Sequence, residues 1–162
     1  MEGIAGYFLK RVCRRGENKM IKIEVNNYIE RPPHEVFRYI ANFENNPKWQ
    51  GGMVKAKFTT PGPIEIGSTY EQTAKFLGKR IITTFKVTEF MEDQKIKIES
   101  ISSSFPIQVT RYVEPSSSGT RVFAIVQGDA RRFFRISEPL LKLMVSSSVK
   151  SDYRKLKKQL EG

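Results

Sequence analysis

The chain has few of the residues that build disulfides and metal centres. Its 162 residues include one cysteine, Cys13, and one histidine, His34. A single cysteine leaves no disulfide partner within the chain and is typical of a reducing compartment, so we expect a cytoplasmic protein. One histidine cannot form a histidine metal cluster, and His34 falls at a predicted helix start, where it would be exposed. Phosphate-binding glycine loops are absent too. We therefore expect no metal and no cofactor.

Long apolar runs are also missing. The run from Ile4 to Leu9 is too short for a membrane span or a secretory signal. Residues 1–19 show no sustained period, so we predict an N-terminal extension at 1–19 outside the fold and one domain at 20–162. A loose tail is the favoured interpretation of the extension, and a weak amphipathic contact with an anionic membrane is the alternative.

Acidic residues are scarce relative to basic ones. The chain has 28 lysines and arginines against 17 acidic residues, a formal net charge of +11. Residues 1–19 hold five basic and two acidic groups, and residues 131–162 hold nine and three. We attribute most of this charge to the solvated face of a helix, while weak contact with an anionic membrane stays open. A nucleic-acid partner is not expected, because no exposed aromatic stacking platform is evident.

The hydrophobic pattern from residue 21 onward predicts one strand, two helices and then a run of strands. Alternation predicts the first strand from Ile21 to Arg31, and Pro32 and Pro33 end it and begin a short helix. A second short helix is predicted over 43–49. Short joints then separate six further strands, which favours antiparallel pairing. These strands are predicted at 53–60, 68–77, 80–90, 95–102, 107–114 and 120–128.

The segment from Ser137 to Leu160 predicts one long helix that closes the chain. Ser137 is a suitable N-cap, and Pro139 suits a first helical turn. Apolar residues recur at three- and four-residue steps, so we expect one face to be buried against the sheet. This stripe comprises Leu140, Leu141, Met144, Val145, Val149, Tyr153, Leu156 and Leu160.

Five segments of the chain together resemble a known superfamily over residues 21–161. They are IEVNNYIERPPHEVFRYIANFENNPKW, GSTYEQT, SSGTRVFAIVQG, EPLLKLM and DYRKLKKQLEG. The chain resembles the START-like, helix-grip (SRPBCC) superfamily and, within it, the polyketide cyclase/dehydrase and lipid-transport branch. The resemblance implies an α+β helix-grip fold of order β-α-α-β6-α. In that fold a curved seven-stranded antiparallel sheet wraps around a long C-terminal helix, with an apolar cavity between them.

Strand alternation then predicts which side chains face this cavity. The lining would be apolar with few polar points, as suits a hydrophobic ligand. Arg111 would need a carboxylate or ligand partner if it points inward, and a register slip would instead turn it outward. Small serines midway along the closing helix would leave space, or else would face solvent. Val54 is also predicted to face the cavity. The predicted lining comprises Phe58, Tyr70, Gln72, Phe76, Thr83, Phe85, Ile98, Ser100, Val109, Arg111, Leu141, Met144, Val145 and Ser148.

Three functions stay open on these residues. We favour binding or transport of a hydrophobic small molecule of lipid, isoprenoid or polyketide type, because most acidic residues fall on predicted outer faces or in loops. The alternative is a cyclase or dehydrase that uses the same cavity without metal or histidine, through Tyr70 or Arg111 with water. The third is a basic interaction module for anionic membrane or RNA.

Overall fold

Residues 20–162 are described in the computed structural model, and the predicted extension at 1–19 lies outside them. The element order confirms the predicted succession and adds one short helix, α4, before the closing helix. In chain order the elements are β1 (Ile21–Ile29), α2 (Pro33–Ala41), η1 (Phe43–Asn45), α3 (Asn46–Trp49), β2 (Met53–Phe58), β3 (Thr69–Phe76), β4 (Lys79–Met91), β5 (Lys95–Ser102), β6 (Ile107–Ser116), β7 (Gly119–Gly128), α4 (Arg131–Phe134) and α5 (Glu138–Glu161).

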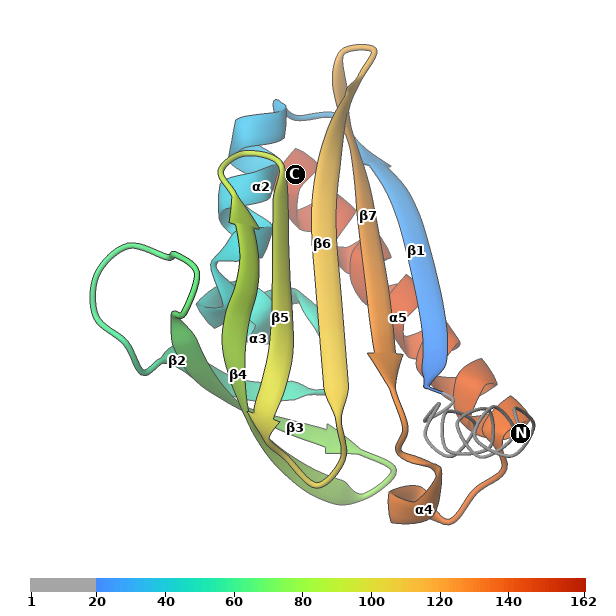
Figure 1. Cartoon of the computed structure of the whole chain (residues 1–162). Helices are drawn as coiled ribbons and strands as arrows, with labels where there is room; N and C mark the ends of the chain where they lie inside the picture. Colours follow the sequence, from blue (N-terminus) through green and yellow to red (C-terminus); the bar gives the residue numbers. More distant parts are fainter. Residues whose placement is uncertain (1–19) are drawn as a thin grey trace, which may run out of the picture.

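The seven strands form one antiparallel sheet in the order β1-β7-β6-β5-β4-β3-β2. The sheet curls around α5, which crosses its concave side (Figure 1). Alternation of apolar and polar residues puts one face of each strand in the core. Along β1, for example, Ile21, Ile23 and Val25 are buried whereas Lys22 and Glu24 are exposed. The α+β helix-grip fold is therefore confirmed.

The edge strand β2 departs from simple alternation. Its pairing with β3 shifts between Met53 and Lys55, so Val54 is skipped in the register. Such a bulge turns the extra residue out of the alternating pattern. Val54 is accordingly 47% exposed, which contradicts its predicted place on the cavity side.

Helix α5 begins where the sequence predicts, although Ser137 caps it by position only. Ser137 has extended backbone angles, but its side chain makes no capping hydrogen bond. Leu141, Tyr153 and Leu156 are buried along the inner face. Leu140 is exposed, contrary to the predicted stripe, because it lies about 100° around the helix from Leu141.

The second half of α5 is held by hydrogen bonds to β1 and to Arg31, which follows that strand. Asn27 Nδ2 donates to the carbonyl oxygen of Tyr153 at 2.9 Å, and Lys157 Nζ donates to that of Tyr28 at 2.7 Å. Arg31 Nε donates to the carbonyl oxygen of Leu160 at 2.7 Å. At the other end of α5, Arg131 Nη1 lies 3.1 Å from the Glu138 carboxylate. Between these two ends, residues 139–151 make no hydrogen bond to another described element.

The helices α2 and α3 fill the concavity beside the second half of α5. Phe37, Ile40 and Trp49 are buried there, and the Trp49 ring meets the Tyr153 ring edge-on at 5.0 Å between centroids. His34 at the start of α2 is exposed, as predicted. No helix within 20–162 is long and apolar enough to cross a membrane.

Candidate ligand-binding site

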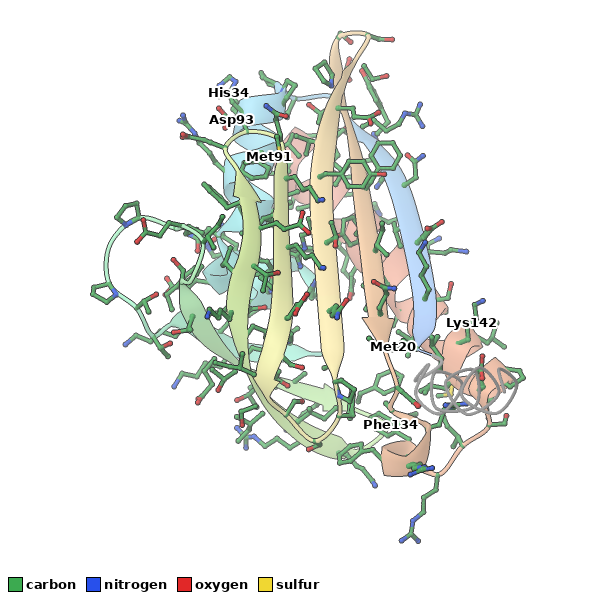
Figure 2. All side chains as sticks on the ribbon, in the orientation of Figure 1. Met20, His34, Met91, Asp93, Phe134 and Lys142 are labelled. Carbon is green, nitrogen blue, oxygen red and sulfur yellow. The ribbon has the colours of Figure 1, made fainter. Side chains whose placement is uncertain are left out.

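A first pocket of about 200 Å³ lies between the sheet and the first half of α5. We call it the apolar pocket, because almost every lining side chain is apolar. Figure 2 shows Phe134, one of its lining residues, near the end of the molecule where α4 leads into α5. The lining comprises Ile21, Ile23, Phe76, Ile81, Phe105, Ile107, Val126, Gln127, Gly128, Ala130, Phe134, Leu141, Val145, Ser148 and Val149.

A second pocket of about 190 Å³ lies further along α5, towards α3. We call it the polar pocket, since its wall brings together charged, amide and phenol groups. Five residues line both pockets, namely Phe76, Ile107, Val126, Ser148 and Val149, so the two adjoin. The polar pocket is also lined by Phe43, Asn46, Gln50, Gly52, Met53, Tyr70, Gln72, Ala74, Lys75, Phe85, Ile98, Val109, Arg111, Asp152 and Tyr153.

Arg111 on β6 is the central cation of the polar pocket. It is only 2% exposed, so the inward orientation predicted for it is the one the fold adopts. Its Nη1 donates to the carbonyl oxygen of Ile40 at 2.7 Å and to Asn46 Oδ1 at 3.0 Å. The guanidinium carbon lies 4.7 Å from the ring centroid of Phe43 and 5.0 Å from that of Trp49. Cation–π contact with two rings offsets part of the loss of hydration.

Tyr70 on β3 stands in an aromatic stack. Its ring lies 4.7 Å from that of Phe43 and 5.2 Å from that of Phe85, both nearly parallel. The Tyr70 hydroxyl donates to Gln72 Oε1 at 3.3 Å. Burial raises the pKa of Tyr70 strongly, against a smaller opposing effect of Arg111. The phenol is therefore neutral near pH 7 and can act as a hydrogen-bond donor but not as a base.

Asp152 places a carboxyl group in the same pocket. Asp152 Oδ1 accepts a hydrogen bond from the Gly51 amide at 2.9 Å, and Lys155 Nζ lies 4.0 Å away. Burial raises the pKa of Asp152, while the Gly51 amide, Lys155 and Arg111 act against this shift. A buried, perturbed carboxyl in a pocket is typical of a functional site.

Ten of the fourteen residues predicted to line the cavity contact one or both pockets. That these residues bind a ligand remains a prediction. They are Tyr70, Gln72, Phe76, Phe85, Ile98, Val109, Arg111, Leu141, Val145 and Ser148.

The other four predicted residues lie off both pockets, each for a local reason. Phe58 packs on Tyr70 towards the sheet edge, with 5.7 Å between the two ring centroids. Thr83 shares a hydrogen bond of 2.9 Å with Ser103, and Ser100 Oγ accepts one from the Ile107 amide at 3.0 Å. Met144 sits at the margin of the inner face of α5, about 60° around the helix from Leu141.

Several lining residues were not foreseen. Asp152 had a visible signal, because it follows Val149 by three residues and Ser148 by four and so shares their helical face. Phe105 and Phe134 had none, since they come from a loop and from a four-residue helix whose positions depend on tertiary packing. Within 20–162 no group of three histidine, cysteine or acidic side chains is placed to hold a metal ion.

Comparison with known proteins shows the family of the chain and its fold. A protein from Thermus thermophilus superposes with a TM-score of 0.72 at 16% identity, over 86% of this chain and 96% of that one. A START superfamily protein from Mycobacterium smegmatis superposes with a TM-score of 0.73 at 11% identity, over 86% of this chain and 97% of that one. The di-domain ARO/CYC StfQ from the steffimycin biosynthetic pathway superposes with a TM-score of 0.72 at 13% identity, over 99% of this chain and 61% of that one.

Sequence comparison gives two further results. No curated protein matches this sequence. The family model described as polyketide cyclase/dehydrase and lipid transport matches residues 20–161. The chain, with its START-like helix-grip fold, therefore belongs to the polyketide cyclase/dehydrase and lipid transport family.

Proposed function

We propose that this protein binds or carries a hydrophobic small molecule of lipid, isoprenoid or polyketide type in the two adjoining pockets. The observation that carries the proposal is the apolar pocket, whose walls are almost entirely hydrocarbon and which opens onto a few polar groups. This composition is typical of small-molecule sites, where apolar walls supply affinity and few polar groups set orientation. Each pocket alone is smaller than the roughly 300 Å³ usual for such sites, so the proposal uses both.

Ser148 on α5 offers a direct test, because it lines both pockets. Replacing it by leucine adds apolar volume where the pockets meet. We expect Ser148→Leu to weaken binding of an apolar fluorescent probe by about five- to 150-fold, which corresponds to an overpacking cost of about 1 to 3 kcal/mol. The neighbouring Ser147 is exposed, so Ser147→Leu is a matched control.

The measurement is a probe titration on three proteins: the unchanged chain and both variants. Mass spectrometry of natively purified protein should also detect a copurified apolar species. Equal probe affinity in the Ser147 and Ser148 variants would place binding elsewhere, and absence of any bound probe or copurified species would count against the proposal.

The same pocket also supports the catalytic alternative. Tyr70, Gln72 and Arg111 gather around one space, as a cyclase or dehydrase acting on a polyketide-type ligand would require. In that case Tyr70→Phe should abolish turnover and leave binding largely intact. Loss of binding together with turnover would instead give Tyr70 a role in ligand binding only.

Location and surface contacts follow from the sequence rather than from the pockets. Cytoplasmic location, an N-terminal extension at 1–19 and weak contact with anionic membrane remain our proposals for this chain.

A further inference from the structure

Arg111 carries a positive charge that the described protein does not pair directly. Among residues 20–162, no carboxylate oxygen lies within 4.0 Å of its guanidinium nitrogens, and Nε is buried without a hydrogen-bond partner. A buried guanidinium without an anion is costly even when aromatic rings cover its faces. Since Arg111 lines the polar pocket, a ligand group in that pocket can supply what the protein lacks.

The surroundings of Arg111 favour an anion. Asp152 is the one carboxyl group in the lining of the polar pocket, and Lys155 Nζ lies 4.0 Å from its Oδ1. Asp152 is engaged by the Gly51 amide, and burial raises its pKa and so shifts it towards its neutral form. The only acidic side chain in this lining is therefore already engaged, and no carboxylate within residues 20–162 contacts the buried Arg111 cation.

The contacts of Arg111 also limit which anion fits. Nη1 already donates to Ile40 and Asn46, Nε is buried, and the Tyr153 hydroxyl lies against the same side chain, so only a small part of the guanidinium is left for a ligand. A planar carboxylate matches a guanidinium edge, whereas a phosphate dianion is normally held by several donors. The adjoining apolar pocket then accommodates the hydrocarbon part of the same molecule.

We propose that the ligand is an amphiphilic carboxylic acid whose carboxylate pairs with Arg111 while its hydrocarbon chain occupies the apolar pocket. This inference rests on the proposed binding function and specifies the polar end of the ligand. Because Arg111 is held by α2, α3 and two aromatic rings before a ligand arrives, its guanidinium is preorganised for the ion pair.

The test compares two ligands with the same hydrocarbon chain, one with a carboxylate and one with its neutral methyl ester. Lauric acid and methyl laurate are titrated, below the concentration at which they aggregate, into the unchanged full chain by isothermal titration calorimetry. The acid should bind at least about tenfold more tightly than the ester, as a charge-assisted hydrogen-bonded pair predicts. Equal affinities would overturn the inference and leave the proposed function intact. Binding of neither compound, with no apolar probe bound, would count against both.

A variant then assigns the preference to Arg111. Arg111→Met should lower the ratio of acid affinity to ester affinity to about one. Arg121→Met is the matched control, because Arg121 is an exposed arginine on β7, and it should retain the preference for the acid. An acid preference that survives in a folded Arg111→Met protein would overturn the assignment. If that variant does not fold, the acid-to-ester ratio of the unchanged chain decides.

Discussion

Two aspartates of this protein illustrate how opposite surroundings give opposite responses to pH. Asp152 lies in the polar pocket, and burial raises its pKa. Asp129, which follows β7, accepts hydrogen bonds from Arg131 at 2.8 and 2.7 Å, and these lower its pKa.

The raised pKa of Asp152 predicts a loss of stability as pH increases. The folded state holds this proton more tightly than the unfolded state, so the contribution of Asp152 to the free energy of unfolding falls as pH rises from about 3.9 to the folded pKa. Asp152→Asn removes the titration and keeps an acceptor for Gly51. We therefore expect the variant to gain stability relative to the unchanged chain across this window, measured by urea unfolding at several pH values.

Asp129→Asn provides the comparison of opposite sign. A lowered pKa contributes stability that is present above the unfolded pKa and is lost as pH falls through the folded pKa. The Asp129 variant should therefore lose stability relative to the unchanged chain as pH rises from the folded pKa to the unfolded one. Parallel pH profiles for the two variants would contradict this explanation.

At the residue scale, the sequence predicts orientation better than it predicts partners. Alternation along β6 projected Arg111 inward and left a register slip as the alternative, because a strand residue can face only two ways. Its contacts with Ile40 and Asn46 could not be foreseen, since they join residues 71 and 65 positions apart. For Asp152, the sequence indicates the helical face on which it lies, but it does not indicate the hydrogen bond with the Gly51 amide.

At the element scale, β5 contains an internal comparison between two isoleucines. Ile96 is fully buried, whereas Ile101 is 59% exposed. Ile96→Ala should lower the free energy of unfolding by roughly 2 to 5 kcal/mol through lost burial and the cavity left behind. Ile101→Ala should cost about 1 kcal/mol or less, mainly through strand propensity.

Chemical denaturation of both β5 variants measures this difference. Similar costs at the two positions would mean that the burial of β5 in solution differs from that in the structure. Because Ile96 and Ile101 line neither pocket, the comparison is independent of ligand binding.

The boundaries of elements were predictable to within about two residues, including the helical segment at 43–49, but α4 and the bulge in β2 were not predicted. Turn residues mark the ends of strands in the sequence itself. The skip at Val54 depends on how β2 pairs with β3, and α4 is a single turn that ends at Arg135 in the left-handed region, with φ of 55°. Neither leaves a periodic pattern in the chain.

At the scale of the whole molecule, the net positive charge plays no part in the packing of the fold. The formal charge of +11 includes Arg154, Lys155 and Lys158, which are exposed on the outer face of α5. We expect weak binding to anionic phospholipid vesicles at low salt that is lost near physiological salt, because counterions screen exposed charges. Vesicle sedimentation measures this, with zwitterionic vesicles as the control, and salt-independent binding would contradict it.

The attachment of α5 at its two ends has a consequence for the range of ligands. Residues 139–151 include the α5 residues that line the apolar pocket, and they make no hydrogen bond to another described element, so no such bond has to break when this segment is displaced. The hydrogen-bonded ladder of β1 and β7 does not include this segment. For the proposed ligand, we therefore expect tolerance of chain length to depend on this helical segment and not on the pairing of the strands.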